Sequence, residues 1–498
     1  MPNSVPASIA AIDLGSNSFH LVVAEPSQGH IKVVDRMREV IRLGAGLDSD
    51  NQLKPAAMAQ ALACLQRFGD RVRHLTHGSV RVVGTNALRK ARNSAAFLRH
   101  AEAALGHPID VVSGIEEARL VYLGVSHGLA DDAGRRLVMD IGGGSTELII
   151  GQRFEPLAME SLHMGCVSMS ERCFADGKID AKRLRAAEII ARQELEPIAE
   201  SFRAHGWQTV VGASGTLLAI AEILSSSGWS SDGITRAGLR ELRAAVIELG
   251  SAEALAKLNV AVDRRPVFAG GLAIALGAFE ELGFERMQVS DSALREGVLY
   301  DLMGRIHHED VRERTVEHLM QRFAVDRTQV DRVVGTAQHL FDQTADEWHL
   351  HDQESAQLLR WAARLHEIGT TVSHSQYQKH GAYLLQYLDM PGFSRGEQRR
   401  LAALVRGHRR KLPEPDAFAT GTNDPQPLIK LCLLLRLAVV LHRARSVTPV
   451  PPLSLVVNGT TLKLNFPKGW LESHALVSAD LEQEANYLKS IGYKLKIK

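Results

Sequence analysis

A glycine-rich turn flanked by apolar strands occurs twice in this sequence, and this repeat limits the folds that the chain can adopt. The copies are Ala10–Val23, Ala-Ala-Ile-Asp-Leu-Gly-Ser-Asn-Ser-Phe-His-Leu-Val-Val, and Leu137–Ile150, Leu-Val-Met-Asp-Ile-Gly-Gly-Gly-Ser-Thr-Glu-Leu-Ile-Ile. In the same frame, Asp13 lies on Asp140, Gly15 on Gly142, Ser18 on Ser145 and Leu21 on Leu148. One copy alone is typical of a tight β-turn with a solvated aspartate, whereas two copies predict two similar half-folds that face one another.

The residues of these turns suit a phosphate-binding site. Glycine lets the backbone adopt positive φ and lets a ligand approach bare amides, and a row of free N–H groups backed by hydroxyls can hold phosphate oxygens. We therefore predict phosphate binding by Ser16, Asn17 and Ser18 of the first copy and by Gly143, Gly144, Ser145 and Thr146 of the second. Asp140 and Glu147, at the two strand ends of the second copy, are placed to hold a hydrated Mg²⁺ ion.

Length and composition are those of an ordinary protein with several domains. The chain has 498 residues, of which 45% are hydrophobic and 23% charged, so it is too long for a single core. Its formal net charge of +1 predicts no nucleic-acid partner and means that any attraction to polyanions must come from local patches. The four cysteines form no Cys-x-x-Cys pair, which favours reduced thiols in a cytoplasmic protein.

No segment of the sequence predicts insertion into a membrane. The N-terminus lacks the basic region followed by an apolar run that marks a signal peptide. The most apolar stretch, Leu428–Leu441, is interrupted by Lys430 and Arg436 and is too short to span a bilayer. We expect a buried helix there and no transmembrane segment, while peripheral membrane association is left open.

Strands alternate with helices through the first 306 residues. Strands are expected over 31–34, 40–43, 80–83 and 109–112, and helices from Pro55, over 95–105 and over 116–126. After the second glycine-rich turn the plan repeats, with strands over 157–161, 209–211 and 287–290 and helices over 181–204, 266–282 and 292–303. This alternation predicts a layered α/β fold.

The sequence changes character from about His307, where it becomes nearly all helical with clustered histidine and arginine. Near the end, Asn458-Gly459 separates two apolar stretches, 453–457 and 461–466, a pattern typical of a type I′ hairpin. We therefore divide the chain into four domains: 1–130, 131–306, a helical domain 307–445, and a small C-terminal α+β domain 446–498.

The motifs together resemble those of the exopolyphosphatase and guanosine pentaphosphate phosphohydrolase family, within the actin/sugar-kinase/Hsp70 ATPase superfamily. The resemblance rests on segments 12–20, 113–120, 140–148, 212–216, 290–297, 365–369 and 405–409, and covers essentially the whole chain. It implies two ribonuclease-H-like (actin-like ATPase) domains, an all-helical HD-like domain and a small α+β domain, as in the long form of the family. It also implies a homodimer with contacts between helical domains.

Hydrolysis of a terminal phosphoanhydride needs an anion cradle, charge neutralisation and a base that aims water in line with the leaving oxygen. Glu117 opens a helix directly after a strand, at the carboxyl end of a sheet, where α/β ligand clefts form. Its neighbour Glu116 can simply complement the helix N-terminus, and the same holds for Glu117. The resemblance implies that Glu117, the second glutamate of Glu-Glu-Ala-Arg, positions the attacking water.

Two further phosphate-binding residues are expected from small-residue turns. Arg89 follows a strand and a tight turn, so its guanidinium can reach the same phosphate, although a surface helix arginine is the alternative. Gly215, in the turn 212–216 that caps a helix N-terminus, completes the predicted phosphate-binding residues.

The helical part contains two groups of interest. The pair His366-Glu367 resembles the His-Asp pair of metal-dependent HD phosphohydrolases, with a longer carboxylate, and helix packing is the favoured role for His366. A basic run is interpreted as the lining of a polyphosphate channel, the alternative being a solvated helix face. The run comprises Arg395, Arg399, Arg400, Arg406, His408, Arg409, Arg410 and Lys411. The predicted channel residues among them are Arg406, His408, Arg409, Arg410 and Lys411.

The favoured function is processive removal of terminal phosphates from inorganic polyphosphate, with Mg²⁺ as cofactor; a monovalent cation such as K⁺ is left open. The alternative is a guanosine pentaphosphate (pppGpp) 5′-phosphohydrolase. Gly144 and the basic run favour polyphosphate, whereas Asp346–Leu350 resembles the nucleotide branch of the family. An ATP-dependent kinase would need a catalytic aspartate in place of the two glutamates and an adenosine pocket, and a non-catalytic sensor would have lost Glu117 or Asp140.

Overall fold

The chain forms two compact units. The computed structural model describes residues 6, 8–27, 30–129, 134–306, 310–419, 424–446 and 448–498. Unit 1 comprises residues 1–310 and unit 2 residues 311–498, and each is described by itself. The finer division into four domains stays a prediction.

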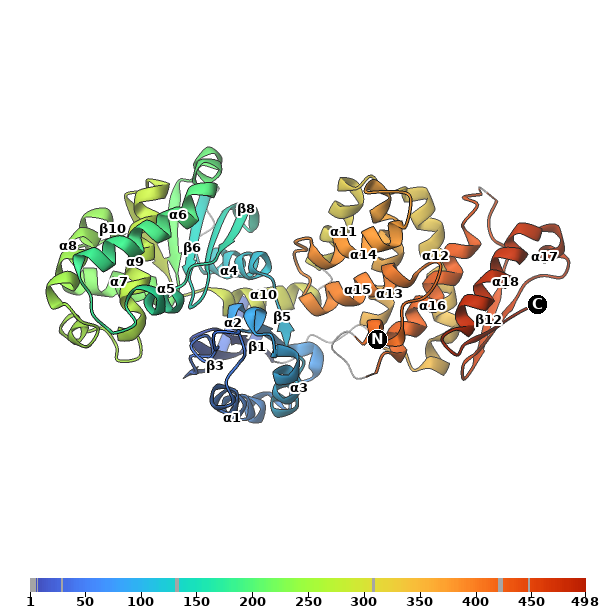
Figure 1. Ribbon diagram of the computed structural model, residues 1–498, viewed down its shortest axis with the longest axis horizontal. Helices are drawn as coiled ribbons and strands as arrows, with labels where there is room; N and C mark the ends of the chain where they lie inside the picture. Colours follow the sequence, from blue (N-terminus) through green and yellow to red (C-terminus); the bar gives the residue numbers. More distant parts are fainter. Residues whose placement is uncertain are drawn as a thin grey trace. The chain divides into compact units, whose positions relative to one another are not determined.

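The first sheet of unit 1 holds the first glycine-rich turn. Its strand order is β3-β2-β1-β4-β5 (Figure 1), with β1 (Ile9–Leu14) antiparallel to β2 (Ser18–Ser27) and parallel to β4 (Val80–Gly84). Both β1 and β4 are buried on both faces, which explains their continuous apolar sequences. The remaining elements of this half are β3 (His30–Val40), β5 (Asp110–Val111), α1 (Pro55–Val72), η1 (His77–Ser79), α2 (Asn86–Lys90) and α3 (Ser94–Leu105).

One expectation for this sheet was wrong: the strand predicted over 31–34 continues to Val40 as β3, and residues 41–43 of the second predicted strand lie outside it. It pairs along the whole of β2, and a register shift at Val23/Ala24 keeps the pairing continuous. Successive β3 residues alternate between exposed and half-buried, as in an outer strand with one face in water. The chain leaves the strand through Arg42, which has a positive φ of 54°.

The second sheet repeats this plan around the second glycine-rich turn. In the order β10-β11-β9-β6-β7-β8, β6 (Arg135–Ile141) is antiparallel to β7 (Thr146–Gln152) and parallel to β9 (Thr209–Ala213). The two glycine-rich turns therefore occupy the same place in two sheets, as the sequence repeat predicted. The other elements are β8 (Glu155–Leu162), β10 (Ile234–Thr235), β11 (Arg286–Ser290), α5 (Cys166–Cys173), α6 (Ala181–His205), α7 (Gly215–Ser226), α8 (Arg236–Leu249), η2 (Glu253–Leu258) and α9 (Arg265–Leu282).

Two helices join the sheets through a common core. Helices α4 (Gly114–Gly128) and α10 (Leu294–Ile306) contribute to one apolar cluster that also contains residues of β1, β4, β6 and β9. A Cβ atom added to Gly297 would lie 1.8 Å from the Leu120 carbonyl oxygen, and one added to Gly124 would lie 1.9 Å from that of Ala293. The two helices thus cross where neither has a side chain, which fixes α4 closely between the two halves.

Unit 2 is helical and ends in a three-stranded sheet. One apolar core runs from α11 to the sheet and α18, and the predicted helix at Leu428–Leu441 is the buried α16. Among the described residues, no helix combines the length and apolar composition needed to cross a membrane. The elements are α11 (Val311–Arg322), α12 (Arg327–Trp348), α13 (Gln353–Leu365), η3 (Ile368–Thr371), α14 (Tyr377–Tyr387), α15 (Arg395–Gly407), η4 (Pro415–Phe418), α16 (Gln426–Leu441), β12 (Ser454–Asn458), β13 (Thr461–Asn465), α17 (Trp470–Ser473), α18 (Ala475–Lys489) and β14 (Lys494–Ile497).

The predicted fold class is confirmed: two α/β halves of like topology precede a helical part and a small α+β piece. The Asn458-Gly459 hairpin also forms, with Asn458 paired to Thr461 and Gly459 at a φ of 54°. Strand β14, which the sequence analysis missed, pairs parallel to β13 and completes that sheet.

Candidate active site

The two glycine-rich turns meet. A Cβ atom added to Gly143 would lie 3.0 Å from the Ser16 Cβ and 3.4 Å from the Asn17 amide nitrogen. Ser16 is buried, and the buried Asn17 Oδ1 has no hydrogen-bond partner among the described residues. The structure therefore brings the turns 15–18 and 142–146 together, as a shared phosphate cradle requires, and leaves amide and hydroxyl groups of both at one place.

The first turn is flanked by a neutral histidine. His20 faces Asp13 across the β1–β2 pair, its Nδ1 lies 3.0 Å from Arg295 Nη1, and its Nε2 lies 2.8 Å from Ser18 Oγ. Because the arginine can only donate, Nδ1 accepts and Nε2–H donates to the serine. Burial, followed by the charges of Arg295, Arg38 and Arg264, lowers the pKa of His20 to about 3.

The second turn is flanked by two carboxyls. Asp140 faces Glu147 across the β6–β7 pair, so Glu147 occupies the place that His20 has in the first sheet. The Ser161 hydroxyl donates to Glu147 Oε1 at 2.9 Å. Thr146, although predicted to bind phosphate, is fully buried and donates its hydroxyl to the Met164 carbonyl at 2.7 Å. Its backbone is paired with β6 and β8, so the structure does not place a free donor of Thr146 at the cradle.

Three buried carboxyls of this site hold protons more tightly than usual. Burial, then the Glu117 carboxylate, raises the pKa of Asp13 to about 7, although the Arg295 charge opposes both effects. Burial, then Glu117 and Asp13, raises the pKa of Asp140 to about 8. Burial, then Glu117 and Asp140, raises the pKa of Glu147 well above its usual range. Glu117 thus faces the carboxyls of both turns, because its charge acts on all three.

The adjacent glutamates at the start of α4 have different surroundings. The Arg89 guanidinium donates to Glu117 Oε2 at 2.6 Å and to the Val112 carbonyl at 3.2 Å. Glu116 is fully buried and accepts two hydrogen bonds from Arg119, at 2.7 and 2.8 Å. Of the two, only Glu117 lies beside the cradle, and one edge of Arg89 is used to hold it there.

The donor set at the cradle suits a hard, hydrated cation. All the carboxyls present oxygen, and the buried Asp13 Oδ1 lacks a hydrogen-bond partner in the described part of the chain. Across those same residues, no three His, Cys, Asp or Glu side chains are close enough to hold a metal ion by themselves. This arrangement fits Mg²⁺, which keeps several waters and commonly uses one or two carboxylates together with substrate phosphates. Asp140 and Glu147, which face one another across the β6–β7 pair, are the side chains that would hold it.

Three residues beside the cradle were not identified from the sequence. The Asn86 carboxamide lies against Gly144, since a Cβ atom added there would be 2.6 Å from Asn86 Oδ1. The Arg264 guanidinium lies against Gly215, where an added Cβ would be 1.8 Å from Arg264 Nη2. Arg295 contacts His20, as described above. Only tertiary packing reveals these neighbours, whereas Asp13 was visible from its alignment with Asp140.

The turn before α7 is held in an unusual conformation. Ser214 has a φ of 115°, a backbone region that is essentially restricted to glycine, and its hydroxyl caps the helix by accepting from the Leu217 amide. Ala213, directly before it, pairs with Asp140 in the sheet. The predicted phosphate-binding residue Gly215 therefore begins a helix at the same sheet edge as Asp140.

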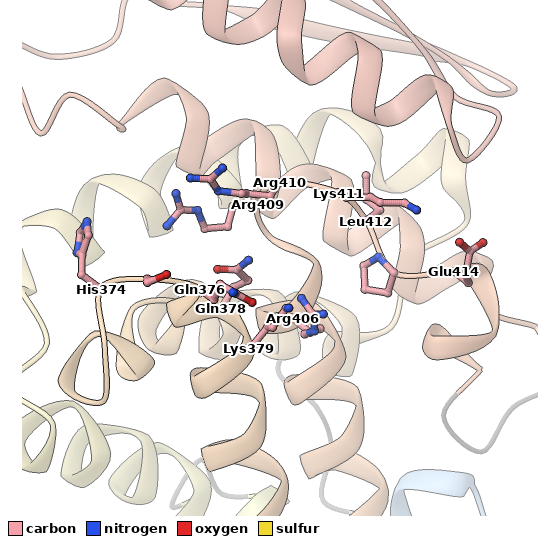
Figure 2. A pocket seen from close by; sticks show the side chains of 12 residues that line it. His374, Gln376, Gln378, Lys379, Arg406, Arg409, Arg410, Lys411, Leu412 and Glu414 are labelled. Carbon is pink, nitrogen blue, oxygen red and sulfur yellow. The ribbon is translucent and has the colours of Figure 1, made fainter.

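Four residues of the predicted basic run line a pocket in unit 2. The pocket has a volume of about 820 Å³ and contains Arg406, Arg409, Arg410 and Lys411, with Lys379 from α14 as a further cation and Glu414 as the acidic residue in its lining. Figure 2 shows these side chains around the cavity. Burial lowers the pKa of Arg406, and the Arg409 guanidinium stacks over Tyr377 at 4.4 Å.

His408 does not belong to this surface, and its prediction as a channel residue was wrong. Its side chain is fully buried and packs against His366, with ring centroids 5.4 Å apart, and against Tyr377. It shares the buried face of α15 with Leu401 and Val405, at helical spacing.

His366 is likewise a buried packing residue. Its Nδ1 lies 2.7 Å from the Ala363 carbonyl, and burial lowers the pKa of its imidazole. Its neighbour Glu367 accepts a hydrogen bond from Arg445 at 2.5 Å.

The chain matches two family models. The first, the Ppx/GppA phosphatase family, matches residues 22–306, and the second, Ppx/GppA phosphatase domain III, matches residues 311–485. The chain belongs to the Ppx/GppA phosphatase family. It is therefore an enzyme, a phosphatase, as the sequence predicted.

Individual relatives agree with this assignment. A guanosine-5′-triphosphate,3′-diphosphate pyrophosphatase of Aeromonas hydrophila is 39% identical over 488 residues, 98% of either chain. The structure of an Aquifex aeolicus PPX-GPPA enzyme is 25% identical, covers 59% of this chain and 99% of its own, and superposes with a TM-score of 0.51. An exopolyphosphatase from Cytophaga hutchinsonii shares the fold, at 22% identity, 60% and 98% coverage and a TM-score of 0.55.

Proposed function

We propose that this Ppx/GppA family member is an exopolyphosphatase that removes terminal phosphates from inorganic polyphosphate. The observation that carries the proposal is the contact between Gly143 and the Ser16-Asn17 turn, with the Glu117 carboxylate facing the carboxyls of both turns. An anion cradle beside a positioned carboxylate is the arrangement that phosphoanhydride hydrolysis needs.

Each part of the site has a role in this reaction. The backbone amides of Asn17, Gly143, Gly144 and Ser145, with the hydroxyl of Ser16, bind the oxygens of the terminal phosphate. The Ser145 hydroxyl instead hydrogen-bonds to the Glu147 carboxyl. Glu117 orients a water molecule in line with the bridging oxygen and accepts a proton from it. The water oxygen bonds to the terminal phosphorus as the bridging P–O bond breaks, which releases orthophosphate and leaves the shortened chain as the leaving group. The Arg89 hydrogen bond of 2.6 Å keeps the Glu117 carboxylate in one orientation, which preserves the geometry of attack.

The cofactor of this reaction is Mg²⁺, with Asp140 and Glu147 as the side chains that would hold it. Bound there, it would neutralise part of the charge on the phosphate chain. The raised pKa values of Asp13 and Asp140, about 7 and 8, reflect carboxyls crowded in a buried site, and a divalent cation would favour their charged forms.

The basic pocket supports polyphosphate as the substrate. Five cationic side chains, from Lys379 and the stretch 406–411, surround one cavity. The desolvated Arg406 guanidinium has no ion-pair partner among the described residues, so a polyanion would provide the missing countercharge. A long phosphate chain has many charges to offer such a surface, and its binding should weaken steeply as salt is added.

A specific observation favours a second candidate, hydrolysis of the 5′-phosphate of guanosine pentaphosphate. The relative from Aeromonas hydrophila that carries this activity in its name matches 98% of the chain at 39% identity. The same cradle and the same Glu117 would serve that reaction, because the bond that breaks is again a terminal phosphoanhydride.

The deciding experiment is phosphate release measured side by side on long-chain polyphosphate and on guanosine pentaphosphate, with Mg²⁺ and with EDTA. We expect faster release from polyphosphate and loss of both activities in EDTA. A kcat/KM larger for the nucleotide would replace the first candidate by the second, and no release from either substrate would refute the proposal. Analytical ultracentrifugation tests the homodimer that the family resemblance implies, and cell fractionation tests the cytoplasmic location.

A further inference from the structure

Asn86 lies against the third glycine of the second turn, although it belongs to the first half of unit 1. It begins α2, and a Cβ atom added to Gly144 would lie 2.6 Å from its Oδ1 and 3.0 Å from its Cγ. Asn86 is only 6% exposed. A buried side chain from one half thus occupies the space that any side chain at position 144 would need.

The Asn86 carboxamide is available to a ligand. No described residue hydrogen-bonds to it, and its polar atoms are not among the enclosed ones that lack a partner. Its amide is therefore accessible, and water or a ligand can hydrogen-bond to it. The neighbouring Gly144 and Ser145 belong to the proposed phosphate cradle.

We propose that Asn86 is a further substrate-positioning residue, whose carboxamide donates a hydrogen bond to a phosphate oxygen. The carboxamide can occupy this position only because Gly144 has no side chain. This inference rests on the proposed function and extends it. Helix α2 then serves the site twice, because Asn86 and Arg89 are three residues apart and lie on one helix face. Asn86 and Gly144 act as one unit, so the size of residue 144 controls the position of the amide.

A double-mutant cycle tests the unit. Asn86→Ala removes the donor, and Gly144→Ala displaces it, so each should lower kcat/KM on polyphosphate by about 10- to 100-fold, the usual effect of losing a hydrogen bond to a charged group. The double variant should be no worse than the poorer single variant, because the two changes remove the same interaction. Gly78→Ala is the matched control, since an added Cβ there meets nothing within 4 Å.

Asn86→Asp separates ligand contact from packing. Aspartate has the shape of asparagine but repels phosphate, so this variant should lose more activity than Asn86→Ala while its melting temperature stays at the wild-type value. If packing alone matters, Asn86→Asp will keep wild-type activity, and the proposal is overturned. Losses that multiply in the double variant would also overturn it.

The same cycle is run on binding, with tripolyphosphate as the probe in isothermal titration calorimetry. This readout does not depend on turnover. Absence of phosphate release from wild-type protein would refute the proposed function, while the coupling between Asn86→Ala and Gly144→Ala in the binding constants would still decide the present inference.

Discussion

Replacement of Glu117 by glutamine tests the proposed mechanism most directly. Glutamine keeps the length of the side chain and an oxygen that can accept the 2.6 Å hydrogen bond from Arg89, so its position should be retained. The charge and the ability to take a proton are lost. A positioned general base contributes about 10²- to 10⁴-fold, and we expect kcat to fall by that factor, equivalent to ~3–5 kcal/mol of activation free energy.

Substrate binding by Glu117→Gln should persist or improve, because a negative charge that faces the phosphate is removed. The Glu117 carboxylate also raises the pKa values of Asp13, Asp140 and Glu147. The variant should therefore bind Mg²⁺ at lower pH than the wild type, since these carboxyls then lose their protons more easily. Phosphate release gives kcat, and calorimetry with tripolyphosphate gives the affinity.

The matched variant is Glu116→Gln, one residue earlier on the same helix. Glu116 is fully buried and bonded to Arg119, so its change should lower the melting temperature while the protein that stays folded keeps its kcat. A near-wild-type kcat in Glu117→Gln would refute the assignment of Glu117 as the base. The same changes of melting temperature and of kcat in Glu116→Gln and Glu117→Gln would also refute it.

Three further predictions concern pH, the basic pocket and the helix crossing. Burial raises the pKa values of Asp13 and Asp140 from 3.8 to about 7 and about 8, so between these limits the folded protein holds protons that the unfolded chain has released. Stability should therefore fall as pH rises from about 4 and level off above about 8, and thermal scans should show a larger gain from Mg²⁺ at pH 8 than at pH 6.5. Arg406→Ala should raise the KM for long polyphosphate in steady-state assays and make that KM less dependent on salt, while hydrolysis of tripolyphosphate stays unchanged. Arg399 is an exposed arginine of the same helix outside the pocket, so Arg399→Ala should leave both KM and its salt dependence at the wild-type values. The same KM for long polyphosphate in the two variants would contradict the pocket's role. Gly297→Ala should destabilise the protein by about 1–3 kcal/mol or more in urea unfolding, because its methyl group would meet the Leu120 carbonyl at 1.8 Å, and an unchanged midpoint would show that α4 and α10 can separate.

The sequence was sufficient to predict what local pattern determines. The repeat of the glycine-rich turn gave the two halves, and alternation of apolar stretches gave most strands and helices. The full length of β3 was missed because the strand lies at the edge of its sheet and carries many polar residues. The stretch Asp35–Glu39 contains only one apolar residue, so the sequence gives no apolar run there. Helical spacing also indicates which residues share a buried face. His408 follows Leu401 and Val405 at intervals of four and three residues, and this spacing predicts a buried His408.

Contacts between distant segments could not be predicted in this way. From the sequence, Glu116 and Glu117 could both simply complement a helix N-terminus. Their hydrogen-bond partners distinguish them in the structure, since Glu116 bonds to Arg119 and Glu117 to Arg89. Arg264 lies in a stretch without a motif, and its position against Gly215 depends on the packing of two turns.

The duplicated turn has one consequence for how charge is distributed around a substrate. The backbone of the two copies is alike, but His20 stands in one where Glu147 stands in the other. The copy with the uncharged imidazole adjoins Arg295, and the copy with the second carboxyl provides the oxygens for a cation. The two turns thus share a backbone plan but differ in charge, with an arginine beside a neutral imidazole on one side and two facing carboxyls on the other. Under the proposed function, an anionic substrate would be attracted to the first side and would need a cation at the second.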